Sequence, residues 1–492
     1  MDNLPLLSLM LLTLPAGAAL IWLLPRPGQA RYIAAGTALV ALAIALAVVF
    51  RFDPAISGFQ LVEQIPWIPN LGVNYLVGVD GFSVLFLPLT ALLFLGAVLT
   101  SFNQVSVSPK AYFSLLLLEG AATLGIFCVL DTLFFFMLWE FSIIPIYFLV
   151  SLWGVGPNRK PAANKYALLM LAGGLLLLFA FLLLALHALD GGGGGSPFDL
   201  RLLLGMHIPA TLQMTVFALL LAGFGVKAPL VPLHTWLPQL ANEGPVAVTA
   251  LIAGLKIGAF GLIRFAFPLA PEAAHAFQWL LVGLGSAGIL YGAVVALAQT
   301  NLRPALAYLG VSHVGLVILG LATFRQEGIA GAVFELLNFT VIAGGSFLVL
   351  DFLRQRVGTT DVTSLGGAMK HLPWLGSFFL LLGLAALGLP GTSGFPAEFL
   401  IILAALQTHT GAGLAALAAM VIGAGCFMVL YQRAFFGPVK NPVLVEAEDL
   451  RMRERMVVIA FALVVLVTGF YPALFLDIIE SAGQAWIARL SP

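Results

Sequence analysis

Apolar runs of about twenty residues recur along nearly the whole 492-residue chain. One helical crossing of a bilayer takes about 20 consecutive apolar residues, and a helix satisfies all of its backbone groups internally. The sequence therefore predicts an all-α polytopic membrane protein. Fourteen helices are expected, at residues 4–24, 31–50, 81–101, 111–130, 132–153, 166–189, 211–233, 245–268, 276–298, 304–323, 328–352, 374–406, 413–435 and 456–480.

The composition excludes several classes of protein. Only 9% of the residues are charged, whereas soluble domains carry about 25%. A soluble enzyme, a nucleic-acid binder and a disulfide scaffold are all excluded, and the net charge of zero implies no bulk electrostatic partner. Cys128 and Cys426 lie inside apolar runs and are expected to be small core residues.

The basic residues orient the predicted spans. Odd-numbered connections hold fifteen Lys and Arg, and even-numbered ones hold five, namely Arg51, Arg201, Arg264, Arg325 and Arg489. By the positive-inside rule the odd connections face the cytoplasm, so both termini face the periplasm. No Lys or Arg precedes the first run, which favours a mature span over a cleaved signal.

Three connections have a character of their own. Residues 51–80 are expected to lie along the surface, Gly191–Gly195 to form a flexible linker, and residues 440–455 to form a mixed-charge cytoplasmic loop. Asp131, at a span boundary, is expected to cap a helix.

The main functional candidates are four ionisable residues within the predicted spans: Glu140, Lys227, Lys256 and Glu398. A charge at bilayer depth costs about 2.5–3.5 kcal/mol, so each is a functional candidate by default, with a structural ion pair as the alternative. Further candidates, each with its own structural alternative, are Glu119, Glu335, His234 and His313.

Acids and amines buried in this way can handle protons. Burial disfavours the charged form of both, so either type can exchange a proton near neutral pH. A row of carboxylates and amines bridged by imidazole or water would form a proton relay. The sequence contains no cysteine cluster, no paired haem-type histidines and no dinucleotide loop, so we expect neither a metal nor a cofactor in this chain.

Two predicted helices contain strong breakers. Pro229, Pro232 and Pro238 follow Lys227, and Pro390-Gly391 precedes Glu398. Breaks at corresponding positions of two five-helix blocks are typical of inverted repeats in transporters. We expect residues 1–105 to hold helices one to three, 106–270 the first repeat (helices 4–8), 271–438 the second (helices 9–13), and 439–492 a cytoplasmic loop and helix fourteen.

The motifs around these residues resemble those of the antiporter-like subunits of proton-pumping NADH:quinone oxidoreductase (respiratory complex I), most closely the subunit M (chain 4) type. The resemblance covers nearly the whole chain. It is carried by Phe134–Glu140 with Pro145, by Lys227-Ala228-Pro229 through Pro238, by Ala307–Gly315, by Leu389-Pro390-Gly391 with Glu398, and by Arg433–Gly437.

The resemblance implies a role for each main candidate. Glu140 and Lys227 would be the pumping pair of a first half-channel, Lys256 the lysine linking the halves, and Glu398 the terminal group of the second half-channel. The chain would be a subunit of a translocase in an energy-transducing inner membrane. Flavin, iron–sulfur clusters and quinone would belong to other subunits, and L- and N-type subunits would be its neighbours.

The sequence departs from the family pattern in the second half. The histidine usual in helix eleven is replaced by Phe339, with Asn338 beside it and Glu335 one turn earlier. We hypothesise that Glu335 replaces the missing imidazole and that Asn338 holds a bridging water. The alternative is that Glu335 lies near the surface and pairs with Arg325.

Three functions remain open from the sequence. The first is the proton-translocating subunit of a complex I-type enzyme. The second is the homologous subunit of a multisubunit cation/proton antiporter or a membrane-bound hydrogenase. The third is an independent secondary transporter, which is disfavoured because the sequence indicates no substrate-sized polar pocket.

Overall fold

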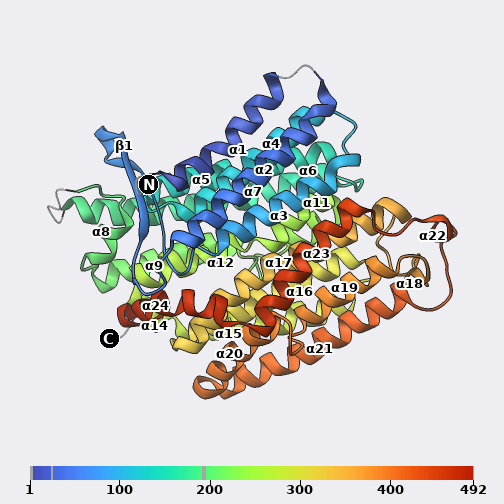
Figure 1. Ribbon diagram of the computed structural model, residues 1–492. Helices are drawn as coiled ribbons and strands as arrows, with labels where there is room; N and C mark the ends of the chain where they lie inside the picture. The colour runs from blue at the N-terminus through green and yellow to red at the C-terminus, as the bar shows by residue number, and fades with distance from the viewer. Residues whose placement is uncertain (1–3, 24–25, 191–194, 491–492) are drawn as a thin grey trace.

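The computed structural model describes residues 4–23, 26–190 and 195–490. Long helices form one bundle, with the N-terminal half of the chain lying beside the C-terminal half (Figure 1). Twelve helices in the described residues are long and apolar enough to cross a membrane, or thirteen if one bent pair counts as a span. The predicted fold class, a helical multi-pass membrane protein, is confirmed.

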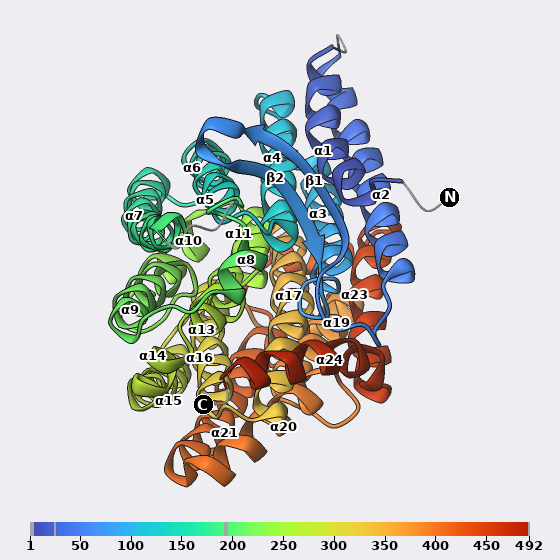
Figure 2. The same ribbon diagram turned by 90° about the vertical axis from the view of Figure 1, so that its left-hand side faces the viewer.

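The N-terminal region contains a β-hairpin that the sequence analysis missed. Its elements are α1 (Leu6–Leu23), α2 (Ala30–Arg51), β1 (Gln60–Ile68), β2 (Val73–Val79) and α3 (Phe86–Thr100). The strands are antiparallel, and the turn between them ends at Gly72, whose φ of +69° suits glycine. The hairpin lies across one end of the bundle, as Figure 2 shows. The expected surface segment is therefore an ordered part of that end.

The middle of the chain contains the first predicted break. The elements are α4 (Pro109–Cys128), α5 (Thr132–Phe141), α6 (Ile143–Trp153), α7 (Arg159–Asp190), α8 (Leu200–Gly205), α9 (Ala210–Lys227), α10 (Trp236–Glu243), α11 (Val246–Gly254), α12 (Ile257–Gly261), a π-helical turn η4 (Leu262–Ala266) and α13 (Phe267–Leu269). Helix α9 ends at Lys227, and the chain resumes as α10 at Trp236. Pro229 and Pro232 lie between them and cannot donate backbone hydrogen bonds.

Asp131 caps α5, as the sequence predicts. Its Oδ1 accepts from the backbone N–H groups of Leu133 (3.1 Å) and Phe134 (3.0 Å). Its Oδ2 accepts from the N–H of Asn74 in β2 at 2.9 Å, which fastens the hairpin to the start of α5.

An additional break, which the sequence analysis did not predict, lies at Lys256. Helix α11 ends at Gly254, Leu255 is extended, and α12 begins at Ile257. A Cβ on Gly254 would lie 3.2 Å from the Thr340 carbonyl oxygen and 3.3 Å from Gly344 Cα, so glycine permits a close helix contact here.

Arg264 is not a loop residue as expected. It lies in η4, where it is 6% exposed and forms a bidentate pair with Asp80, with N–O distances of 2.6 and 2.8 Å. It therefore does not count toward the surface charges of either membrane side.

The C-terminal half surrounds one central helix. Its elements are α14 (Pro271–Ala276), α15 (Gln278–Leu297), α16 (Leu302–Ala322), α17 (Gln326–Val357), α18 (Ala368–His371), α19 (Pro373–Ala386), α20 (Gly394–Thr408), α21 (Thr410–Phe435) and α22 (Val443–Glu446). The most apolar window of α17 is entirely buried. Between α19 and α20 the chain unwinds, with Gly388 (φ +64°) and Gly391 (φ +90°) in the left-handed region. This is the second predicted break.

The expected single span 456–480 is two helices. α23 (Met452–Phe470) and α24 (Ala473–Leu490) meet at an angle of 68°. Pro472 cannot continue the hydrogen-bond ladder and disfavours a helical conformation at Tyr471. Figure 2 shows α24 lying across the same end of the bundle as the hairpin.

Other expectations have mixed outcomes. Cys128 and Cys426 are free and buried, as expected of core residues. Of the predicted glycine linker, residues 191–194 lie outside the described residues. The domain boundaries and the inverted relation of the two blocks remain predictions.

Candidate proton-relay site

Lys227 lies at the C-terminal end of α9, beside the first break. Its Nζ donates a 2.7 Å hydrogen bond to Ser142 Oγ and lies 4.2 Å from the centre of the Trp139 ring. Ser142 stands at the junction of α5 and α6, and its hydroxyl donates to the Trp139 carbonyl oxygen at 2.8 Å. The amine is thus held by one hydroxyl and one aromatic face.

Two carboxylates, those of Glu119 and Glu140, lie within electrostatic range of the Lys227 amine. Glu119 of α4 lines the same small cavity as Lys227, Tyr166 and Trp236, with a volume of about 20 Å³. A cavity of that size holds about one water molecule. The structure therefore brings Glu119, a secondary candidate, to the Lys227 amine.

Glu140 forms no hydrogen bond with the Lys227 amine in the described part of the chain. Its carboxylate lies against Gly174 of α7, where a Cβ would overlap it, and its Oε1 is buried without a hydrogen-bond partner in the described part of the chain. Among the contacts of the described residues, the Lys227 amine meets Ser142 and Trp139 rather than Glu140. A proton passing between Glu140 and Lys227 therefore needs a bridge such as Ser142 or water.

Lys256 occupies the unpredicted break between α11 and α12. It is 3% exposed, and its Nζ has no hydrogen-bond partner among the described residues. The ammonium lies 4.9 Å from the centre of the Phe339 ring on α17. Breaking the helix at this residue places a buried amine between the two halves of the bundle.

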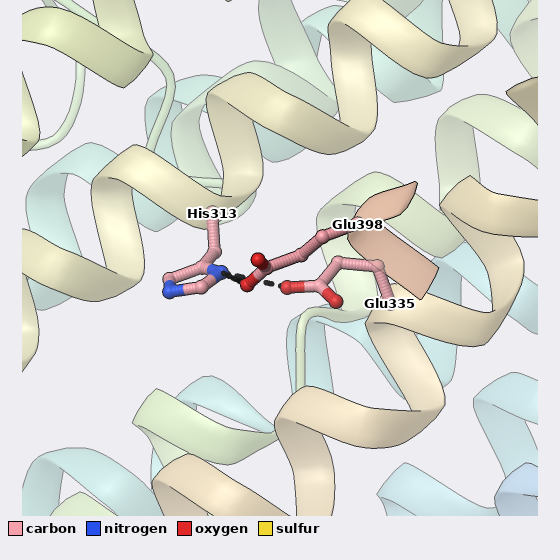
Figure 3. A group of neighbouring side chains, drawn as sticks. All are labelled: His313, Glu335 and Glu398. Atoms are coloured by element: carbon pink, nitrogen blue, oxygen red, sulfur yellow. Dashed lines mark hydrogen bonds and ion pairs between the residues drawn. The ribbon is translucent and has the colours of Figure 1, made fainter. Parts of the chain in front are cut away.

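The second predicted break positions a three-residue cluster. His313 of α16, Glu335 of α17 and Glu398 of α20 point toward one another (Figure 3). His313 Nδ1 shares a 2.7 Å hydrogen bond with Glu335 Oε1 and lies 3.8 Å from Glu398 Oε1. Glu335 is fully buried and Glu398 is 2% exposed.

The cluster is suited to storing a proton. One ligand atom from each residue lies within 4.8 Å of the others, a spacing that would also accept a metal ion. Two carboxylates this close in a buried site are stable only when they share a proton or face a cation. His313 supplies that cation when its ring is protonated.

The neighbours of Glu335 distinguish a buried position in the relay from a surface position near Arg325. Asn338 Nδ2 donates to Glu335 Oε2 at 3.4 Å and its Oδ1 accepts from Ser393 Oγ, so Asn338 contacts both groups directly. Arg325 pairs instead with Glu327, at 3.5 Å. The surface position for Glu335 was therefore wrong.

His234 is not part of either cluster. It lies between α9 and α10, 3% exposed, with ring centres 4.9 Å from Tyr291 and 6.1 Å from Tyr308. Neither ring nitrogen has a hydrogen-bond partner in the described ranges. Its placement allows a role in a path toward one membrane surface, and the packing alone also accounts for it.

Sequence reasoning missed Ser142 and Trp139 as partners of Lys227. A hydroxyl in the apolar stretch two residues after Glu140 was the available signal. That Ser142 meets an amine 85 residues away depends on how α5 and α9 pack.

Comparisons with known proteins identify the family of the chain. A family model described as "NADH:quinone oxidoreductase/Mrp antiporter, TM" matches residues 130–423. Chain 4 of the NAD(P)H-quinone oxidoreductase of Synechococcus sp. (strain WH7803) is 34% identical, over 99% of this chain and 90% of that protein. Subunit M of the NADH-quinone oxidoreductase of Rhodobacter capsulatus is 32% identical, over 92% and 89%.

A solved structure matches the whole fold. A chain of respiratory complex I from Thermus thermophilus with bound NADH superposes with a TM-score of 0.90 at 31% identity, covering 99% of this chain and 100% of that chain. The fold is thus that of a membrane subunit within a multisubunit complex. The chain belongs to the NADH:quinone oxidoreductase/Mrp antiporter family of membrane subunits, in the group of its subunit M (chain 4) members.

Proposed function

We propose that this chain is a proton-translocating membrane subunit of a complex I-type NADH:quinone oxidoreductase. The observation that carries the proposal is that each of three helix breaks holds an ionisable group in the interior: Lys227, which is half-buried, and Lys256 and Glu398, which are buried. Unwound backbone at membrane depth occurs where it lines a polar path. The nearly full-length similarity to quinone oxidoreductase subunits favours this function over a cation/proton antiporter or hydrogenase subunit.

The proposed path runs from Glu140 and Glu119 to Lys227, through Lys256, to the His313–Glu335–Glu398 cluster. Small cavities beside Lys227 (about 20 Å³) and His313 (about 30 Å³) have room for about one or two waters. The two helix blocks, related as inverted repeats, would each supply one half of this path. A change of charge at one end of this path, produced elsewhere in the complex, would then drive proton transfer along it.

In this proposal Glu335 replaces the imidazole found in relatives. The support is its burial and its 2.7 Å hydrogen bond to His313. Glu335 and Glu398 hold a shared proton, and His313 passes it between them.

The chain contributes no redox chemistry in this proposal. Flavin, iron–sulfur clusters and quinone belong to other subunits, and L- and N-type subunits flank this one. Its odd-numbered connections face the cytoplasm, and both termini face the periplasm. Lipid covers the remaining outer faces.

The test is proton pumping by membrane vesicles that contain the assembled complex. Lys227→Ala should abolish pumping because it removes the amine at the first break, while the complex still assembles. Glu140→Gln should act in the same direction, because Gln keeps the shape but cannot ionise. Glu140→Asp should be milder.

Controls make the test decisive. Lys440→Ala replaces an exposed lysine far from the proposed path and should leave pumping unchanged. Full pumping by assembled Lys227→Ala and Glu140→Gln complexes would refute the proposed function.

A further inference from the structure

An aromatic ring packs against both Lys256 and the acid–imidazole cluster. Phe339 of α17 is 5% exposed. Its ring centre lies 4.9 Å from Lys256 Nζ and 4.9 Å from the centre of the His313 ring. Phe339 therefore contacts both Lys256 and His313, which are consecutive groups of the proposed relay.

The surrounding backbone leaves room for this arrangement. A Cβ on Gly310 of α16 would lie 3.2 Å from Lys256 Nζ and 3.4 Å from two atoms of the Phe339 ring. The glycine thus lets the amine and the ring pack together against α16. A larger residue at position 310 would force one of them to move.

The Phe339 ring also provides the main interaction that offsets the burial of the Lys256 amine. Lys256 Nζ has no hydrogen-bond partner in the described part of the chain, and an aromatic face attracts a cation more strongly when the cation is desolvated. The ring face can hold an ammonium, but phenylalanine has no proton to give and no site to accept one.

We propose that Phe339 is a gate between Lys256 and the His313–Glu335–Glu398 cluster. With the ring in place, the ammonium is held and no chain of hydrogen bonds joins it to His313. When the ring turns aside, water enters and a proton crosses. The inference rests on the proposed relay and assigns Phe339 as a positioning residue that prevents uncontrolled flow.

The test is passive proton conductance of the purified complex in proteoliposomes, without NADH, under a potassium–valinomycin potential. Phe339→Ala should raise the proton leak several-fold above wild type, because the space it opens beside two polar groups fills with water. Phe339→Leu should stay near the wild-type leak, because leucine still blocks the space. Phe347→Ala makes the same truncation at another fully buried site on α17 and should not leak.

Turnover separates the gate from a structural role. With NADH present, Phe339→Ala should oxidise NADH at a rate near wild type but pump fewer protons per electron. A merely structural residue would lower both rates together without a leak. A wild-type leak in the Phe339→Ala complex, or an equal leak from Phe347→Ala, would overturn the gate.

The gate and the relay fail in different ways. If Lys256→Ala and Glu398→Gln complexes pump fully, the relay itself is wrong. If those variants lose pumping while Phe339→Ala neither leaks nor loses coupling, the relay stands and only the gate is wrong.

Discussion

The two broken-helix regions hold their ionisable groups in opposite ways. At the first break, a single amine is anchored by Ser142 and Trp139, and its carboxylates interact from a distance. At the second, two carboxylates and an imidazole meet directly, with a 2.7 Å hydrogen bond between His313 and Glu335. One region stores positive charge beside an aromatic face, and the other stores a proton between acids.

The difference teaches that one type of helix break can serve opposite charges. A buried amine needs a neutral or acidic partner, such as the hydroxyl or ring face found here, because a second amine would repel it. Two acids need a proton or an imidazolium between them. With Phe339 beside Lys256 and Glu335 beside His313, the second region is an acid cluster.

Within the second region, the largest effect is expected at Glu398. Glu398→Gln should lower pumping by about 10²-fold, the typical cost of removing a positioned proton-transfer group. Proton release per electron in proteoliposomes measures it. Glu480→Gln makes the same change at an exposed site on α24 and serves as the control. Unchanged pumping by Glu398→Gln would remove the second region from the relay.

A smaller loss is expected at Glu335. Glu335→Gln should lower pumping by about tenfold, because His313 and water still offer part of the path. Adding Phe339→His, the residue type that relatives carry, should restore part of the loss by returning an imidazole to the line. The same pumping assay reads both variants, and a double variant no better than Glu335→Gln would count against the replacement.

Ser142 sharpens the description of the first region. Ser142→Ala removes the hydrogen bond that the Lys227 amine forms within the described residues and should slow pumping about threefold, or ~0.7 kcal/mol. The Trp139 ring still holds the charge, so the effect stays below that at Glu335. Ser142→Thr should retain near-normal rates, and an equal loss in both variants would indicate altered packing instead.

The smallest effect on pumping is expected outside the membrane, at Asp131. Asp131→Ala should cost about 1 kcal/mol of stability through loss of the α5 cap while leaving pumping rates unchanged. Burial raises the pKa of Asp131 from its usual 3.8 to about 6, and hydrogen bonds from Asn74, Phe134 and Leu133 oppose part of that rise.

The sign of the pH effect follows from this shift. The folded chain binds the Asp131 proton more tightly than the unfolded chain, so this contribution is full below about pH 4 and lost as the pH rises through about 6. Thermal unfolding of wild type between these values should show a fall in stability with pH that Asp131→Asn lacks. The same slope in both proteins would contradict the assignment.

Much of this fold could be predicted from the sequence because membrane helices are local. Apolar runs, prolines and the Asp131 cap each report on their own few residues and gave most helices correctly, although twelve or thirteen candidate spans stand in the described residues where fourteen were expected. The hairpin at 60–79 was missed because its strands are short and lie outside the hydrophobic runs. The bend at Tyr471-Pro472 was missed because the apolar character continues across it.

The site shows the same limit more sharply. Lys227, Lys256 and Glu398 stand out in the sequence because a charge in an apolar run is costly. The contacts of Lys227 with Ser142, of Glu119 with the Lys227 cavity, and of Phe339 with Lys256 join helices far apart in the chain. No periodicity encodes those meetings, so they required the packed structure.

The most direct test of a single relay through both regions is the proton yield per electron of a Lys256→Ala complex. Lys256, at the break between α11 and α12, is the buried group between the Lys227 region and the Glu398 region, so its loss should disconnect regions that both remain intact. Proteoliposomes that oxidise NADH while proton release and electron flow are recorded together provide the measurement. We expect an assembled complex that pumps no better through this subunit than Lys227→Ala. A wild-type proton yield from Lys256→Ala would show that the two regions do not form one path.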